Sequence, residues 1–149
     1  MEQVKPFDVK IGDEIPPLTR VISGDMVIAY EEDLDRLSGI VSREKPSFHA
    51  DEGMASRTMY GAPTAQGILT EALMSVLLTR WLPDPRGWIT GGTLTSKFIA
   101  PVWYEDTLTY QARVTGIQPE GDQRRVFLEV WAHNQAGKKV IVGDASALV

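Results

Sequence analysis

The amino-acid sequence predicts an α+β domain in which a long antiparallel sheet wraps around one buried helix. A strongly apolar helix is expected from about residue 64 to residue 81, and from Gly87 onward the apolar residues recur with a period of two. These are the spacings of a buried helix and of half-buried strands. Helices followed by a run of strands are typical of an antiparallel sheet packed on helices. We expect the 149 residues to form one domain, 1–149.

The composition is ordinary for a globular protein, with 43% hydrophobic and 23% charged residues. The chain contains no cysteine, which excludes disulfides, thiol nucleophiles and cysteine-based zinc sites. Its two histidines are too few for a histidine-rich metal site, so we expect no bound metal. The net charge of −5 disfavours general binding to nucleic acid or to anionic membranes.

Membrane and export signals are missing from the sequence. No segment approaches the roughly 20 apolar residues that a membrane-spanning helix needs. The N-terminal residues lack the apolar core of a signal peptide. We therefore expect a cytoplasmic protein without a membrane partner.

A short strand and an amphipathic helix are expected near the N-terminus. Leu18–Ile22 has the composition of a strand, and Ser23 can cap the helix that follows. Residues 25–37 carry apolar side chains at helical spacing and acidic side chains on the other face. Gly39 is expected to lie beyond the end of this helix.

Residues 40–66 contain several prolines and glycines and show no sustained period. An irregular segment of this length is uncommon inside a small domain and is often functional. A short helical turn is expected within it, at residues 51–56.

The helix at residues 64–81 is the strongest in the chain. Its apolar residues follow the i, i+3, i+4 pattern, and Met74 and Leu78 widen the stripe until the helix is apolar almost all round. Such a helix is expected to be buried. Pro83 and Pro85 prevent its continuation.

Four strands are expected in the C-terminal half, at residues 88–101, 107–118, 124–134 and 139–149. A single curved sheet of this size leaves an edge strand exposed, and an exposed edge can pair with another chain. We therefore expect a homodimer, or a higher homo-oligomer, that pairs such edges.

Two residues carry the strongest chemical signal. Histidine is the residue type that ordinarily exchanges a proton near neutral pH, so the side chain at position 49, His49, could both hold and release one. Gly67 lies near the start of the long helix, where free N–H groups and the helix dipole favour a carbonyl oxygen or an anion. Local sequence leaves open that His49 is a structural loop residue and that Gly67 only permits close packing. His133 lies in an expected strand, and we expect it at the surface or in a dimer contact.

Several spaced matches connect the chain to a known family. His49 and Gly67 are eighteen residues apart, Ala55 follows His49 by six, and Phe98-Ile99-Ala100-Pro101-Val102 precedes Glu105-Asp106. In these matches the chain resembles the MaoC-like, (R)-specific enoyl-CoA hydratases, which have the hot-dog fold. The resemblance covers residues 11–145. It implies a long antiparallel sheet wrapped around a central buried helix.

The resemblance also implies catalytic roles. The family carries a carboxylate five residues before its histidine, usually an Asp, and Glu44 has this position here. Glu44 and His49 would then form an acid–base pair, and the Gly67 N–H would bind the substrate carbonyl oxygen. By its local sequence alone Glu44 could instead be a solvated member of a charged run. Asp51 is a competing acid, which we expect to cap the turn that follows it, although it could instead orient His49.

Five residues are predicted to contact the substrate: Gln66, Ser75, Phe48, Arg57 and Lys97. Ser75 falls where the family often has a serine facing the substrate, although it could instead bond to the preceding helical turn. Arg57 and Lys97 are candidates for the phosphates of coenzyme A. Trp88 and Trp103 could line an acyl tunnel, although packing within strands is the simpler interpretation.

Three functions are compatible with these residues. The first is a hydratase or dehydratase that acts on the 2,3 double bond of an acyl thioester carried by coenzyme A or an acyl carrier protein. It requires no metal or redox cofactor. The second is a thioesterase in which Glu44 or Asp51 activates water. The third is a non-catalytic protein that binds an acyl or polyketide-like ligand, since fold alone does not decide function.

Overall fold

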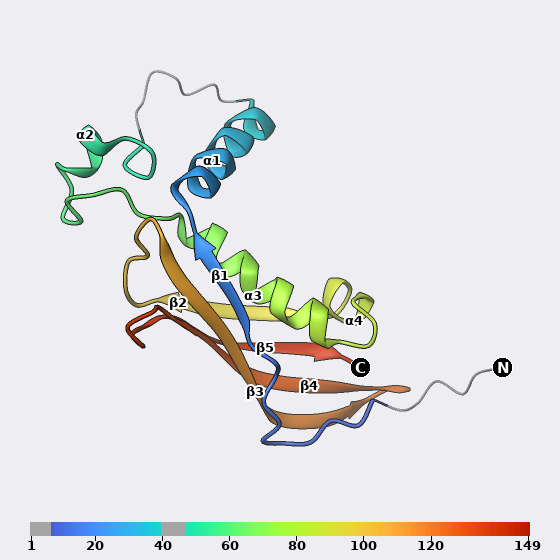
Figure 1. The fold of residues 1–149 in the computed structure, drawn as a ribbon. Helices are drawn as coiled ribbons and strands as arrows, with labels where there is room; N and C mark the ends of the chain where they lie inside the picture. Colours follow the sequence, from blue (N-terminus) through green and yellow to red (C-terminus); the bar gives the residue numbers. More distant parts are fainter. Residues whose placement is uncertain (1–6, 40–46) are drawn as a thin grey trace.

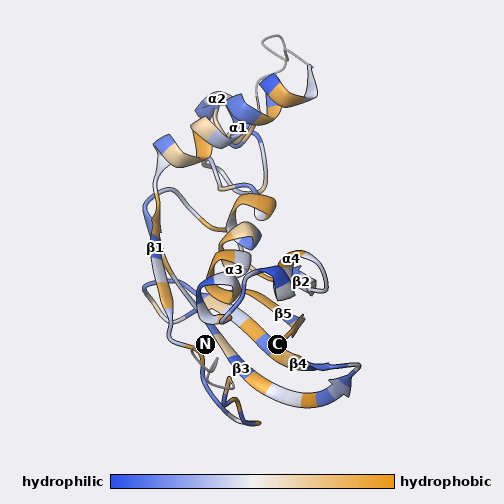
Figure 2. Ribbon diagram, turned by 90° about the vertical axis from the view of Figure 1, so that its right-hand side faces the viewer, coloured by the Kyte–Doolittle hydropathy of each residue, from blue (hydrophilic) through white to orange (hydrophobic). Residues whose placement is uncertain are grey.

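The computed structural model describes residues 7–39 and 47–149. One five-stranded antiparallel sheet dominates this part of the chain, with the strand order β1-β3-β4-β5-β2. The strands are β1 (Leu18–Ile22), β2 (Thr93–Phe98), β3 (Asp106–Glu120), β4 (Gln123–His133) and β5 (Lys139–Leu148). The sheet curves around the helix α3 (Gly67–Trp81), as Figures 1 and 2 show. The predicted α+β class and wrapped arrangement are therefore confirmed.

The three long strands β3, β4 and β5 form the centre of the sheet. Alternate residues of β3 and β4 are buried, and the colours along these strands in Figure 2 alternate accordingly. The buried apolar residues among them lie on the face of the sheet that packs toward α3, as the period of two in the sequence requires. A shift in register between Val114 and Gly116 interrupts the pairing of β3 with β4. Such irregularities bend a strand, which helps the sheet to curve.

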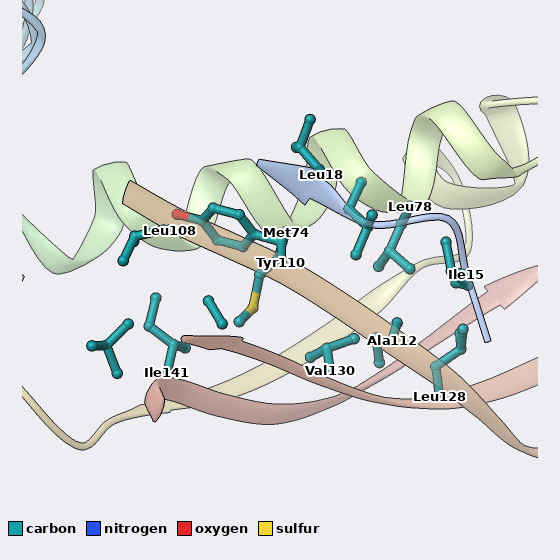
Figure 3. Packing of buried hydrophobic residues seen from close by; sticks show 14 of the residues in the cluster. Ile15, Leu18, Met74, Leu78, Leu108, Tyr110, Ala112, Leu128, Val130 and Ile141 are labelled. Carbon is teal, nitrogen blue, oxygen red and sulfur yellow. The ribbon is translucent and has the colours of Figure 1, made fainter. Parts of the chain in front are cut away.

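The core lies between the sheet and one face of α3 (Figure 3). Met74 and Leu78 of α3 are fully buried, and they pack against Leu108, Tyr110 and other inward-facing strand residues. The opposite face of the helix is more open, and the side chain of Ile68 is 63% exposed. α3 is thus buried on one side and not all round, because the sheet covers only that side.

The first helix, α1 (Gly24–Ser38), follows the prediction closely. The hydroxyl of Ser23 accepts a hydrogen bond from the Met26 N–H at 3.2 Å, and Gly39 ends the helix with a φ of 67°. Val27 is its one fully buried side chain among the described residues. Figures 1 and 2 show α1 and α2 (Glu52–Ala55) beyond the N-terminal end of α3, away from the main body of the sheet.

The region before β2 differs from the prediction. A strand was expected from residue 88, but a short helix, α4 (Arg86–Ile89), occupies this position and β2 begins only at Thr93. The carboxylate of Asp84 accepts a hydrogen bond from the Arg86 N–H at 2.9 Å, which fixes the first turn. Gly87 packs so closely on the end of β5 that a Cβ would lie 2.0 Å from the Leu148 carbonyl oxygen. These local contacts favour a helical turn over an extended chain.

No helix in residues 7–39 and 47–149 is long and apolar enough to cross a membrane.

Candidate active site

A cavity of about 400 Å³ lies where the N-terminal end of α3 meets the loop before it and the segment after β2. It is lined by Phe48, His49, Met59, Tyr60, Thr64, Ala65, Gly67, Thr70, Phe98, Ile99, Ala100, Pro101, Val102 and Ile141. Most of these side chains are apolar, and the polar groups come from one histidine, one tyrosine, two threonines and the helix end. An apolar chamber with a few convergent polar groups is the usual form of a small-molecule site.

His49 reaches this cavity from a tight turn. The Ser47 hydroxyl accepts a hydrogen bond from the His49 N–H at 3.1 Å, and the Ser47 carbonyl accepts bonds from the Ala50 and Asp51 N–H groups. The ring of Phe48 lies against the imidazole, with a centroid separation of 4.0 Å. The turn and the neighbouring ring together restrict where the imidazole can point.

The imidazole is also oriented by the backbone of the segment that leads into α3. Its Nδ1 lies 2.7 Å from the Thr64 carbonyl oxygen. A carbonyl oxygen only accepts hydrogen bonds, so Nδ1 must carry a proton. In neutral His49 the lone pair is then on Nε2, and in protonated His49 the Nε2–H is the proton that can be released. The contact with Thr64 therefore makes Nε2 the nitrogen available for proton transfer.

Gly67 is the first residue of α3 and lines the same cavity. The first N–H groups of a helix have no partner within the helix. The Gly67 N–H donates to no acceptor in the described part of the chain. At the positive end of the helix dipole, this N–H can donate to the oxygen of a bound carbonyl.

Space, and not backbone conformation, requires a glycine at this position. The φ of Gly67 is not in the positive range. A Cβ built on Gly67 would lie 2.9 Å from the Phe98 ring, which covers this end of α3. The hydroxyl of Thr70 donates to the Gly67 carbonyl at 2.8 Å and supports the first turn. The glycine therefore leaves room for the Phe98 ring beside the start of α3.

The structure brings His49 and Gly67 together at one cavity, as the resemblance to the family implied. Glu44, the predicted carboxylate partner, lies outside the described residues. Asp51 caps α2, because its Oδ1 accepts a hydrogen bond from the Met54 N–H at 2.6 Å, and this prediction is confirmed. No Asp or Glu among residues 7–39 and 47–149 lines the cavity.

Two of the predicted substrate-contacting residues flank the catalytic candidates directly. Phe48 lines the cavity beside His49. Gln66 is buried, but its side-chain amide donates to the Val27 carbonyl at 3.3 Å and to a carboxylate oxygen of Glu31 at 3.1 Å. The structure thus turns Gln66 toward α1, where it joins the two helices.

The other three predicted contact residues do not line this cavity. Ser75 is half-buried two turns further along α3, and its carbonyl accepts a bond from the Thr79 hydroxyl at 2.9 Å. Arg57 is exposed after α2. Lys97 lines a separate depression of about 270 Å³ on the sheet. It lies next to Phe98 on β2, and successive strand residues point to opposite faces.

The two tryptophans proposed for an acyl tunnel have different surroundings. Trp88 lies in α4 and packs on the core, and Trp103 contacts the ring of Tyr60 edge-on at 6.4 Å. Neither tryptophan lines the cavity. His133 lies half-buried at the end of β4.

Several lining residues were not singled out by the sequence. Phe98 and Ile141 face each other across β2 and β5 and form part of the wall. The motif at residues 98–102 was used only as a mark of the fold, although all five of its residues line the cavity. Thr64 and Thr70 gave no signal in the sequence. Residues far apart along the chain reach the wall through strand pairing, which local patterns do not encode.

Comparison with known proteins places this arrangement among described families. The profile of the MaoC like domain matches residues 31–135. A curated relative, an (R)-specific enoyl-CoA hydratase of Rhodospirillum rubrum, is 32% identical over 119 residues, which cover 80% of this chain and 78% of the relative.

Solved structures share the fold at lower sequence identity. An (R)-hydratase from A. caviae involved in PHA biosynthesis superposes with a TM-score of 0.72 at 23% identity, covering 95% of this chain and 97% of the other. An R-hydratase from Pseudomonas aeruginosa gives a TM-score of 0.69 at 26% identity, covering 95% and 82%. A MaoC-like dehydratase from Rhodospirillum rubrum gives 0.72 at 23% identity, covering 95% and 92%. The hot-dog fold is therefore confirmed.

Proposed function

The chain belongs to the MaoC-like domain family and is a hydratase of that family, and we propose that its substrate is an acyl thioester. It would add water to the 2,3 double bond of the acyl group or, in the reverse direction, form this double bond by removing water. The observation that carries this proposal is the shared cavity of His49 and Gly67. It combines a group that transfers protons near neutral pH with a free N–H at a helix start. The carrier of the acyl group would be coenzyme A or an acyl carrier protein. The proposed reaction uses no metal or redox cofactor.

The Gly67 N–H would bind the thioester carbonyl. Its hydrogen bond strengthens as negative charge develops on that oxygen, so it lowers the barrier to an enolate-like state. Gly67 has no Cβ, and the Phe98 ring fills the place that a side chain would take, so the carbonyl would approach the N–H from the cavity that both residues line.

Glu44 and His49 would share the proton transfers. The Glu44 carboxylate takes one proton from water while the water oxygen forms a bond to Cβ of the enoyl group. Nε2 of protonated His49 positions that water and delivers a proton to Cα, so the elements of one water molecule are added. Transfer of the proton from Glu44 to His49 then restores the starting state. Dehydration follows the same steps in reverse.

The lining of the cavity supports an acyl substrate. Phe98, Ile99, Val102 and Ile141 supply apolar surface to the cavity that His49 and Gly67 also line. Apolar walls favour an acyl chain through burial of its surface. The volume of about 400 Å³ falls within the range of about 300–1,000 Å³ for small-molecule sites.

We also propose that two copies of the chain associate along β2. This strand lies at one edge of the sheet, and within residues 7–39 and 47–149 it pairs with β5 alone. Beside it lie exposed apolar side chains, among them Phe98 at 51%, Ile99 at 52% and Ile68 at 63% exposure. Unpaired strand edges and apolar patches are typical of interaction surfaces. Light scattering of the purified protein should give twice the chain mass of 16.5 kDa, and a monomer would contradict this.

One assay tests the proposed reaction. The protein is incubated with a short trans-2-enoyl-CoA while the enone absorbance and free thiol are both followed. Loss of the enone without thiol release supports hydration. Thiol release would instead establish the thioesterase, in which water attacks the carbonyl carbon, and no reaction would favour the binding protein.

Two substitutions test the assigned residues. His49→Ala and Glu44→Gln should each lower kcat by about 10²–10⁴-fold, the usual contribution of a general acid or base. His133→Ala is the matched control and should keep full activity. If both His49→Ala and Glu44→Gln are as active as the unmodified enzyme, the assignment of the site is wrong.

A further inference from the structure

One short segment, residues 102–104, contacts both halves of the candidate active site. The Val102 carbonyl accepts a hydrogen bond from the Ala65 N–H at 2.8 Å, just before α3 begins. Trp103 pairs with Thr64 in an isolated antiparallel bridge. The hydroxyl of Tyr104 donates to the His49 carbonyl oxygen. The same segment is therefore bonded to residues 64 and 65, which lead into α3, and to the turn that carries His49.

The backbone at Tyr104 is fixed by the turn that leads into β3. The Trp103 N–H donates to the Asp106 carboxylate at 2.9 Å, and the Asp106 N–H donates back to the Trp103 carbonyl at 3.1 Å. Glu105 has a φ of 66°, and its N–H donates to the Ile22 carbonyl at 2.8 Å. Tyr104 thus projects from a turn tied to the body of the sheet.

The ring of Tyr104 is also confined. It lies against the start of α1, where a Cβ on Gly24 would be 2.8 Å from the ring. The Gly24 N–H donates to the Glu105 carboxylate at 3.1 Å, which keeps this helix end against the turn. Because the ring is packed on backbone, the hydroxyl has a defined place and is directed to the turn at His49.

We propose, on the basis of the proposed function, that Tyr104 is a positioning residue for His49, and that its hydroxyl sets the direction in which the imidazole presents Nε2 to the substrate. The turn at His49 pairs with no strand among the residues that the structure describes, so few of the described bonds determine its orientation. Its N–H is bonded to Ser47, its ring to the Thr64 carbonyl, and its carbonyl to Tyr104. Of these three bonds, the one from the Tyr104 hydroxyl connects the turn to the residues that lead into β3.

Electrostatics keeps the Tyr104 hydroxyl a donor. Burial raises the pKa of Tyr104, and the nearby carboxylates of Glu31 and Glu52 raise it further. The hydroxyl therefore stays protonated at neutral pH. A carbonyl oxygen needs such a donor, so the contact does not change while the imidazole gains and loses its proton.

Tyr104→Phe tests the proposal, because it keeps the ring against Gly24 and removes only the hydroxyl. A net hydrogen bond is worth up to about a tenfold change in the population of the correctly oriented state, so kcat should fall by about 10-fold while KM changes by less than about 2-fold. Tyr30→Phe is the matched control, since Tyr30 lies on α1 away from the cavity. It should leave kcat and KM unchanged.

Nuclear magnetic resonance of the two histidine rings gives a readout that does not depend on the reaction. His49→Ala assigns the His49 signals, and His133 is the internal reference. In Tyr104→Phe the His49 ring signals should shift or broaden, whereas those of His133 should stay in place. This measurement remains decisive if the enzyme proves inactive on enoyl thioesters, in which case the proposed function fails separately.

Two outcomes would overturn the proposal. The first is an unchanged His49 spectrum in Tyr104→Phe together with unmodified kcat. The second is a rise in KM with unchanged kcat and an unchanged His49 spectrum, which would make Tyr104 a substrate-binding residue.

Discussion

The body formed by the sheet and α3 is held together in a different way from the segment at residues 47–66. In the body, β3, β4 and β5 pair along most of their lengths, and their inner faces bury a continuous core. The loop segment depends on single contacts, such as the bond of His49 Nδ1 to the Thr64 carbonyl and the cap at Asp51. Stability should therefore reside mainly in the body, and the orientation of His49 mainly in the loop.

Met74→Ala should produce the largest effect and should act on stability alone. Met74 is completely buried between α3 and the sheet. Truncating a buried side chain of this size costs about 2–5 kcal/mol, to be measured by urea denaturation. Met59→Ala is the matched control: Met59 lies in the loop and is 91% exposed, so its loss should change stability by less than about 0.5 kcal/mol. Equal effects of the two substitutions would contradict the division between body and loop.

Gly67→Ala, in contrast to Met74→Ala, should have its large effect on turnover. The added methyl group meets the Phe98 ring and displaces the carbonyl from its donor. A misplacement of about 1 Å can lower the rate about 10²-fold, which corresponds to about 2.7 kcal/mol. The measurement is kcat/KM for the enoyl thioester.

The added methyl group could slow turnover by colliding with the Phe98 ring or by obstructing the substrate carbonyl directly. Combining Gly67→Ala with Phe98→Ala separates these two causes. If the methyl group acts by colliding with Phe98, the double variant should recover activity. If it blocks the carbonyl directly, the double variant should remain slow. Full activity of Gly67→Ala itself would remove Gly67 from the proposed mechanism.

Asp51→Ala should have a moderate effect confined to the loop. It removes the side chain that caps α2, and the loss of a helix cap costs about 0.5–2 kcal/mol. Asp51→Asn should retain most of the stability, because an amide oxygen can cap the helix as well. Both variants are compared by thermal unfolding and by kcat. If Asp51→Asn unfolds normally but has lost turnover, Asp51 orients His49 and its cap is secondary.

Tyr110→Phe should have the smallest effect, and the sign of the change in stability is informative. The hydroxyl of Tyr110 is buried in the core and has no partner in the described part of the chain. Burial without a bond is unfavourable, so removing the hydroxyl should leave stability unchanged or raise it by about 1 kcal/mol. Tyr104→Phe, which removes a bonded hydroxyl, provides the contrast. A clear loss of stability in Tyr110→Phe would show that its hydroxyl is bonded in solution.

The body was largely predictable from the sequence. The helix ending at Trp81 and the three long strands follow from periodicity, because their alternation is dictated by one buried face. The cap of α1 at Ser23 and the cap of α2 at Asp51 follow from side chains that accept bonds from nearby N–H groups. α4 was missed because its cause, close packing of Gly87 on Leu148, is a tertiary contact.

The site was predictable only in part. The spacing of His49 and Gly67 indicated a shared location because the resemblance to the family supplied the connection between loop and helix. Spacing did not reveal which way side chains point, and Gln66 and Lys97 are directed away from the cavity for this reason. Tyr104 gave no signal, since its role arises from a contact with His49 across 55 positions in the chain.

The location of β2 at the sheet edge also affects motion at the cavity. Phe98, on this strand, forms part of the cavity wall, and β2 pairs with only one neighbour. Peripheral hydrogen bonds open at lower free energy than those at the centre of a sheet. The amides of β2 should therefore exchange with deuterium sooner than those of β4, so the wall beside Gly67 opens transiently while the core stays closed. A second copy bound along β2 would slow this exchange, and assembly would thereby regulate how readily a substrate enters.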